Sequence, residues 1–235
     1  MNLAPFDTTR SPEAIAEAQR SVIMRVYGWM ALGLTVTAAA AFYTLTNERL
    51  LNAILGSMWV FIGLLVIEIA LVMVLSARLM KLTVNGARLA FIAYAALNGV
   101  TLSFLMLVYT AASVAQVFAL TAGLFGVMAV YGYITKTDLT RWGNLLMMGV
   151  LGLIVALVVN MFLRNTTIDL ALSVLGVLVF VGLTAYDSQK IKRMAAAVDP
   201  ESEMGHKVAI IGALTVYLDF INMFLWLLRL FGRRR

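Results

Sequence analysis

Three acidic residues lie within or at the ends of long apolar runs, where an ionised side chain is costly. They are Glu68, Asp187 and Asp219. A charged side chain at the centre of a bilayer costs roughly 3 kcal/mol on insertion scales, so it persists only where it faces protein or water. Asp219 stands near the middle of the apolar run 209–231. We therefore expect this run to be an interior helix, with Asp219 at the functional centre.

Helical spacing places two of these acids on stripes of small and polar residues. On the run 209–231, positions three or four residues apart form one face, made of Gly212, Thr215, Asp219, Asn222 and Trp226. The run 168–188 carries a second stripe, made of Ser173, Gly176, Phe180, Thr184 and Asp187. Small and hydroxylated residues let membrane helices approach closely and supply polar partners. If the two stripes face each other, the carboxyl groups of Asp187 and Asp219 come close together.

Two neighbouring carboxylates in a desolvated site cannot both ionise cheaply, so they share a proton. Such a pair is a pH-sensitive latch, closed when protonated and repelling when ionised. Carboxylate oxygens are also the ligands that Ca²⁺ prefers. We therefore predict that Asp187 and Asp219 sense pH, gate an ion path and contact Ca²⁺. The alternative for Asp187, which begins the polar sequence DSQK, is a solvated acid at the membrane edge.

Three further residues are candidates for an ion path or for pairing. Glu68 lies within the apolar run 54–77, where it either has a functional role or pairs with a core asparagine. Arg78 follows that run, and it either extends its charge to the membrane surface or pairs with an acid. Asn222 stands about one helical turn after Asp219.

The composition indicates that membrane-spanning helices position these residues. Of 235 residues, 62% are hydrophobic and 13% are charged, whereas soluble domains carry about twice that charged share. Runs of about 20 residues suit α-helices, since barrel strands are about half as long and alternate strictly. We expect an all-α integral membrane protein with seven transmembrane helices, the last one central and surrounded by the other six. The expected spans are 22–44, 54–77, 89–109, 112–134, 143–163, 168–188 and 209–231.

Three segments make up the expected organisation: a polar segment 1–21, a seven-helix domain 22–231 and a basic tail 232–235. With seven crossings, more lysines and arginines lie on the side of the amino terminus, which the positive-inside rule places in the cytoplasm. The basic tail then lies on the less favoured side, unless the last span is re-entrant. Its arginines are suited to contact anionic lipid head groups.

Several function classes are excluded by residues that the sequence lacks. It contains no cysteine, so disulfides and thiol catalysis are excluded. A single histidine and the absence of HExxH, GxSxG and P-loop motifs argue against an enzyme, and we expect no cofactor. The net charge of +6 comes from basic residues between apolar runs, so membrane orientation explains it better than a nucleic-acid partner.

Two long segments resemble signatures of a known family. The segment 182–192, GLTAYDSQKIK, and the segment 213–224, ALTVYLDFINMF, resemble the sixth and seventh spans of the Bax inhibitor-1 (transmembrane Bax inhibitor motif) family. The segments 95–103, AALNGVTLS, and 131–139, YGYITKTDL, resemble the bacterial branch of that family. The resemblance extends from about residue 20 to the end of the sequence, and it implies a bacterial inner membrane protein.

The resemblance also implies a function and roles for individual residues. It implies seven helices with the last one central, and a pH-sensitive calcium leak that is latched by two aspartates, here Asp187 and Asp219. Glu68 matches an acid of the second span. Arg78 is the nearest match to an arginine that exchanges partners with the span-six aspartate. The alternatives are a non-transporting regulator that binds another membrane protein, such as a protease or a death-pathway partner, and a proton-coupled exchanger.

Overall fold

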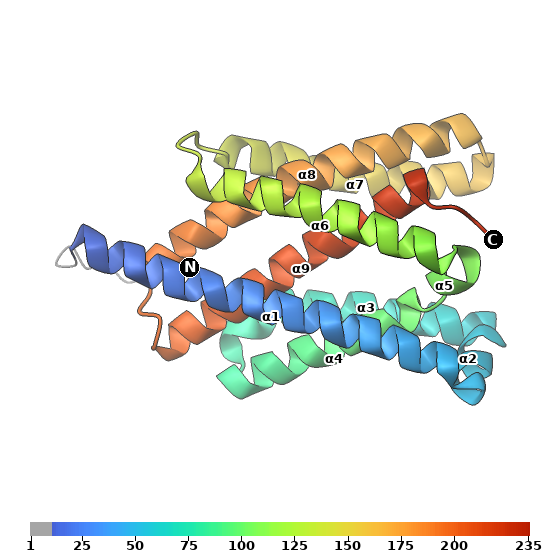
Figure 1. Cartoon of the computed structure of the whole chain (residues 1–235), viewed down its shortest axis with the longest axis horizontal. Helices are drawn as coiled ribbons and strands as arrows, with labels where there is room; N and C mark the ends of the chain where they lie inside the picture. Colours follow the sequence, from blue (N-terminus) through green and yellow to red (C-terminus); the bar gives the residue numbers. More distant parts are fainter. Residues whose placement is uncertain (1–10) are drawn as a thin grey trace. The chain divides into compact units, whose positions relative to one another are not determined.

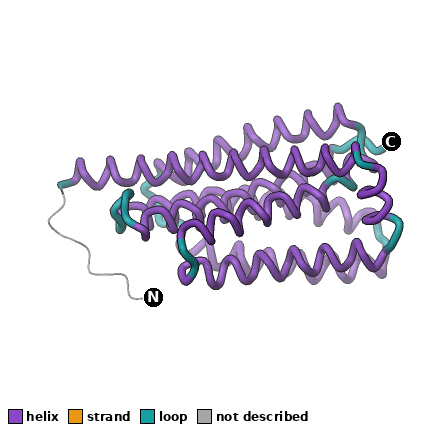
Figure 2. Tube along the Cα trace, turned by 90° about the horizontal axis from the view of Figure 1, so that it is seen from below, coloured by secondary structure: helices purple, strands orange, loops and turns teal. Residues whose placement is uncertain are grey.

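The computed structural model describes residues 11–235, which form helices joined by short loops (Figure 1, Figure 2). Within this range, seven spans are long and apolar enough to cross a membrane, which confirms the predicted all-α membrane fold. The helices are α1 (Pro12–Thr46), α2 (Glu48–Leu55), α3 (Met58–Arg78), η1 (Leu79–Lys81), α4 (Val84–Leu102), α5 (Leu105–Val108), α6 (Ala111–Ile134), α7 (Thr140–Leu163), α8 (Thr166–Ala196) and α9 (Glu203–Phe231).

Several helices continue beyond the apolar runs that predicted them. α1 begins at Pro12, so the described part of the predicted polar segment 1–21 is mostly helical, while residues 1–10 of that segment lie outside the described residues. α8 continues past 188 to Ala196, and Ile191 and Ala195 are buried on this extension. Charged residues at a helix end lower the hydropathy without ending the helix, because lysine, arginine and glutamate favour helix.

α9 is one continuous helix of 29 residues. At a rise of 1.5 Å per residue, a helix of this length is about 43 Å long, which exceeds the hydrocarbon thickness of about 30 Å. The unbroken helix supports full crossing rather than a re-entrant segment. The most apolar window of α9 is 72% buried, whereas no other span exceeds 39%. The prediction that the other six helices surround α9 stays a prediction.

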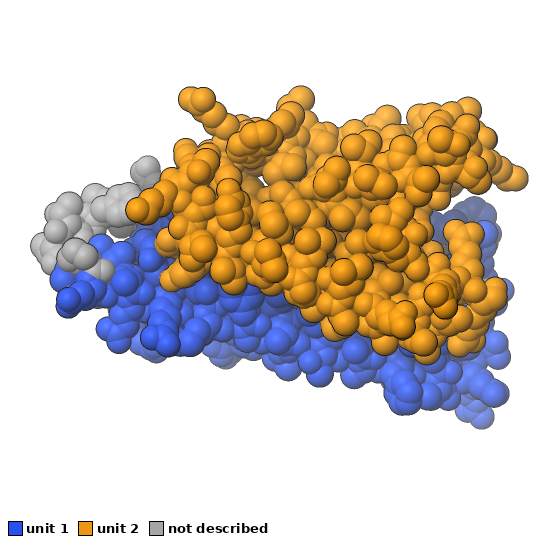
Figure 3. Space-filling model, turned by 45° about the horizontal axis from the view of Figure 1, so that its top comes forward, with its two compact units in different colours: residues 1–107, 193–214 blue, residues 108–192, 215–235 orange. Residues whose placement is uncertain are grey.

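The chain divides into two compact units, coloured separately in Figure 3. Unit 1 contains residues up to 107 and 193–214. In it, α1 and α3 both pack against α4. The hydroxyl of Thr37 donates to the carbonyl oxygen of Ala95 at 2.9 Å, and Gly99 leaves no room for a Cβ beside the Thr37 backbone. Small residues therefore bring α1 and α4 into backbone contact.

Unit 2 contains residues 108–192 and 215–235, so it holds both of the predicted latch aspartates. Glycines again mark the closest helix contacts. Gly132 of α6 lies against the backbone of Ala185 of α8, and Gly143 of α7 lies against the ring of Tyr186. A side chain at either glycine would collide with α8. These two contacts fix the part of α8 that precedes Asp187.

The basic tail 232–235 is held by the segment between α5 and α6. The amide of Thr110 donates to the carbonyl oxygen of Arg233 at 3.0 Å, and the amide of Arg235 donates to the carbonyl oxygen of Val108 at 3.0 Å. The amide of Arg233 also donates to the hydroxyl of Ser113 at 2.9 Å. The tail backbone is thus held against a neighbouring loop.

Candidate functional site: the aspartate pair between α8 and α9

α8 and the second half of α9 run antiparallel and touch along their length. Asp169, near the start of α8, pairs with Arg229 near the end of α9. One and a half to two turns further along α8, Gly176 lies against the indole ring of Trp226. Still further along, Asp187 faces Asp219. The stripes read from helical spacing therefore do face each other at these positions.

The carboxyl groups of Asp187 and Asp219 lie within hydrogen-bonding reach of each other. Both residues are buried, with 7% and 5% of their surface exposed. The solvated-acid alternative for Asp187 is therefore wrong. Among the described residues, no N–H or O–H group donates to the buried Oδ2 of Asp219. A buried carboxylate oxygen without a donor is costly, so the pair requires either a proton on one carboxyl group or a cation close by.

One positive charge lies near the pair. Nζ of Lys190 is 4.0 Å from Oδ1 of Asp187, one helical turn further along α8. The Lys190 side chain is 54% exposed, whereas that of Asp187 is 10% exposed. Nζ also lies 5.9 Å from the centre of the Tyr186 ring. Lys190 thus provides partial compensation for an ionised Asp187 from the solvent-accessible side.

Gln189 anchors the segment of α8 that carries Asp187, a role that the sequence analysis missed. Its Oε1 accepts from the amide of Leu139 at 3.0 Å, and its Nε2 donates to the carbonyl oxygen of Thr137 at 2.8 Å. Further along α8, Nζ of Lys192 donates to the carbonyl oxygen of Tyr133 at 2.8 Å. The sequence DSQK places Gln189 two residues after Asp187. The partners of its side-chain amide lie about 50 residues away along the chain, and no spacing rule identifies them.

The polar residues of the two predicted stripes bond mainly to their own helices. The hydroxyl of Thr184, which is fully buried, donates to the carbonyl oxygen of Phe180 at 2.8 Å. Nδ2 of Asn222 donates to the carbonyl oxygen of Leu218 at 2.8 Å, and Asn222 is half-buried. Its amide is therefore engaged within α9, and its predicted place on an ion path stays a prediction.

Glu68 belongs to a separate polar cluster in unit 1. Its Oε2 accepts from the hydroxyl of Thr101 at 2.9 Å, so its observed partner is a threonine. The expected kind of partner, a core asparagine, is present nearby as Asn98, but Nδ2 of Asn98 points to the hydroxyl of Tyr94 at 3.4 Å. Arg78 ends α3 with an exposed side chain. Its predicted exchange with Asp187, which lies in unit 2, stays a prediction.

Seven membrane-spanning helices and a buried aspartate pair across two antiparallel helices define a polytopic membrane protein with an internal acidic site. The chain belongs to the Bax inhibitor-1 family. The family model described as "Inhibitor of apoptosis-promoting Bax1" matches residues 19–235, which include both aspartates and all of the spans except the first four residues of the first one.

Bacterial proteins are among the similar sequences. The inner membrane protein YbhL of Escherichia coli K12 is 46% identical over 217 residues, covering 92% of this chain and 93% of YbhL. An uncharacterised protein of Borreliella burgdorferi is 40% identical over 230 residues, covering 98% of this chain and 99% of its own length. An uncharacterised membrane protein of Streptococcus pyogenes is 36% identical, covering 89% of this chain and 91% of its own length. The similarity thus extends over nearly whole chains.

Proposed function

We propose that this protein is a passive, pH-sensitive calcium leak channel gated by Asp187 and Asp219. The observation that carries the proposal is the buried Oδ2 of Asp219, which lacks a donor and belongs to a carboxyl group within reach of Asp187. Such an arrangement needs a proton or a cation to be stable. A proton and a cation would compete for the same carboxyl pair, and this competition is a simple physical basis for a leak that depends on pH.

At low pH, one carboxyl group of the pair is protonated and donates a hydrogen bond to the other. This bond joins α8 to α9 across a site with little water, where hydrogen bonds to a charged group are strong. The contact between Gly176 and Trp226 on the same interface keeps the two helices close. The latch is then closed, and the path between the helices is blocked.

At higher pH, the shared proton leaves and two negative charges face each other. Two unit charges about 4 Å apart repel by about 4 kcal/mol at an effective dielectric constant of about 20. The repulsion favours separation of α8 and α9 and attracts a cation. This repulsion sets the direction of the pH dependence: the leak increases as pH rises and decreases as pH falls.

Calcium in this account is a passing ion. Ca²⁺ takes six to eight oxygen ligands in sites that retain it, and the described residues contain no group of three or more side chains of the kind that hold a metal. Two carboxylates therefore supply only part of the coordination shell, and water supplies the rest. Weak coordination suits conduction, because an ion that binds too tightly does not leave.

We place the protein in the bacterial inner membrane with its amino terminus in the cytoplasm, since lysines and arginines favour that side. With α9 crossing fully, the carboxyl terminus lies on the opposite side. The proposed activity is transport without catalysis and without a cofactor, and its partners are the lipid bilayer, Ca²⁺ and protons.

The experiment uses the purified full chain in liposomes that contain a calcium-sensitive dye. Calcium flux of the wild type is expected to increase with pH. Asp219→Asn is expected to give a low flux at every pH, because its amide donates permanently to the Asp187 carboxylate. Glu48→Gln, which removes an exposed acid at the start of α2, is the charge-matched control and is expected to behave as the wild type.

Absence of flux over the whole pH range would overturn the proposal. The protein would then be better described as a regulator that binds another membrane protein. A regulator of that kind would keep its effect on the partner when both aspartates are replaced by asparagine.

A further inference from the structure

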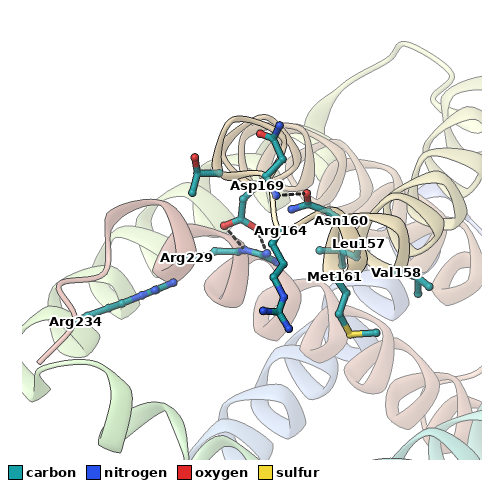
Figure 4. Close-up of a pocket in the computed structure, with 10 residues that line it drawn as sticks. Leu157, Val158, Asn160, Met161, Arg164, Asp169, Arg229 and Arg234 are labelled. Atoms are coloured by element: carbon teal, nitrogen blue, oxygen red, sulfur yellow. Dashed lines mark hydrogen bonds and ion pairs between the residues drawn. The ribbon is translucent and has the colours of Figure 1, made fainter.

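A cavity of about 540 Å³ lies in unit 2, between the end of α7, the start of α8 and the end of α9 (Figure 4). Three arginines, Arg164, Arg229 and Arg234, line it together with one acid, Asp169. Because these three helices are membrane spans that end or begin here, the cavity lies near a membrane surface. It is separate from the aspartate pair, because Asp187 lies about five to six turns further along α8.

The charges that line the cavity are not balanced. Arg229 makes a two-pronged ion pair with Asp169, drawn as dashed lines in Figure 4. Among the described residues, the side chains of Arg164 and Arg234 have no hydrogen bond or ion pair. The positive charge of Arg234 also repels the positive charge of Arg229. Three guanidinium groups around one carboxylate leave a positive site suited to an anion.

Arg164 occupies a backbone position that normally favours glycine. It caps the end of α7 in the left-handed conformation, with φ 51° and ψ 36°, and no other non-glycine residue in the described part of the chain has a positive φ. Glycine is the usual residue at such a helix end, because it has no Cβ to clash. An arginine in this conformation strains the backbone, and this strain points to a role for the arginine side chain.

The backbone around both unpaired arginines is fixed. The amide of Asn165 donates to Oδ1 of Asn160 at 3.1 Å, which closes the loop after Arg164. The amide of Thr110 holds the carbonyl oxygen of Arg233, the residue before Arg234. The two guanidinium groups are therefore presented from an ordered frame rather than from free ends of the chain.

An apolar surface adjoins the charged part of the cavity. Leu157, Val158 and Met161 of α7 line it. Met161 and its neighbour Phe162 are 66% and 77% exposed, as expected for side chains that face lipid. A ligand that fits is anionic at one end and apolar at the other.

We infer that this cavity binds the phosphate head group of an anionic phospholipid, with Arg164 and Arg234 contacting the phosphate and the acyl chains lying along α7. Guanidinium groups bind phosphate through paired N–H donors. Free inorganic phosphate can accept the same hydrogen bonds from guanidinium groups, but it has no apolar part that could pack against the apolar surface. The site explains why basic residues cluster at this end of the last span.

The test compares lipid binding by native mass spectrometry of the full chain in detergent. Phosphatidylglycerol is titrated against phosphatidylcholine, which has no net charge, and inorganic phosphate is added as a competitor. We expect preferential binding of phosphatidylglycerol that inorganic phosphate does not displace. The double variant Arg164→Gly, Arg234→Gln is expected to bind phosphatidylglycerol about tenfold more weakly.

Two variants separate binding from folding. Arg164→Gly alone is expected to weaken lipid binding while leaving the melting temperature unchanged or higher, since glycine suits the left-handed backbone. Arg141→Gln, which removes an exposed arginine at the opposite end of α7, is expected to bind as the wild type. The inference is overturned if the double variant binds phosphatidylglycerol like the wild type, if both lipids bind equally, or if inorganic phosphate displaces the lipid.

Discussion

Gly132 of α6 lies directly against the backbone of Ala185 of α8, and no Cβ fits between them. Ala185 precedes Asp187 by two residues, so this contact fixes the position of the aspartate relative to α6. The side-chain amide of Gln189 anchors the same segment from the other side of Asp187. Asp187, one half of the proposed latch, is therefore carried by a part of α8 that these contacts hold in place.

Replacing Gly132 by alanine tests this contact. The new methyl group meets backbone atoms, which cannot move aside as a flexible side chain would. We expect Gly132→Ala to destabilise the protein by roughly 1–3 kcal/mol, measured as a lower melting temperature in detergent. Gly126→Ala on the same helix is the matched control, because a Cβ at Gly126 meets nothing within 4 Å. Equal melting temperatures for the two variants would contradict the contact.

Removing the charge of Lys190 is expected to move the pH dependence of the calcium flux. The ammonium group, 4.0 Å from Asp187, favours the ionised pair. Without it, ionisation requires a higher pH, so Lys190→Gln is expected to shift the rise in flux to higher pH. Because Lys190 is 54% exposed, solvent screens its charge, and the shift is expected to stay below about one pH unit.

The control for Lys190 is Lys136→Gln, which removes an exposed lysine of the loop between α6 and α7. Its flux profile is expected to match that of the wild type. A shift toward lower pH in Lys190→Gln would show that the lysine opposes ionisation of the pair, contrary to the account. If the flux profiles of both variants shift equally, the shift results from the net charge of the protein and not from the position of Lys190 beside Asp187.

The hydrogen bond between Thr101 and Glu68 is expected to stabilise unit 1. Thr101→Val keeps the shape of the side chain but removes the donor to the half-buried Glu68 carboxyl group. We expect a loss of roughly 1–3 kcal/mol in the free energy of unfolding. Thr101→Ser keeps the hydroxyl and is expected to lose less. The role of this hydrogen bond is refuted if valine is tolerated as well as serine in melting experiments.

The sequence predicted the number of spans well because hydropathy over about 20 residues is a strong signal. Helix ends were less accurate, since α8 continues to Ala196 through a charged stretch that hydropathy excludes. No expected span includes residues 48–53, which form most of the short α2 (Glu48–Leu55). Asn47 caps this helix by accepting from the amide of Leu50 at 3.1 Å, and a helix of eight residues is too short for a hydropathy signal that selects runs of about 20.

The aspartate pair was predictable because each acid lies on a stripe of small and polar residues, and such stripes tend to face each other. Asp219 in particular is hard to place anywhere but in an interior. Partners from distant parts of the chain were not predictable. Thr101 lies 33 residues from Glu68, and Gln189 lies 50 residues from Leu139. A single sequence carries no pattern that links such pairs.

The most direct test of the account is the protonation of the aspartate pair, followed by infrared spectroscopy of the purified protein. A protonated carboxyl group absorbs at a different frequency from a carboxylate. Because Glu68 is a second, half-buried carboxyl group, the signal of the pair is taken as the difference between the wild type and the double variant Asp187→Asn, Asp219→Asn. Over a titration from about pH 5 to about pH 9, this difference is expected to show one protonated carboxyl group that disappears as pH rises. A difference without this signal at any pH would contradict the shared proton.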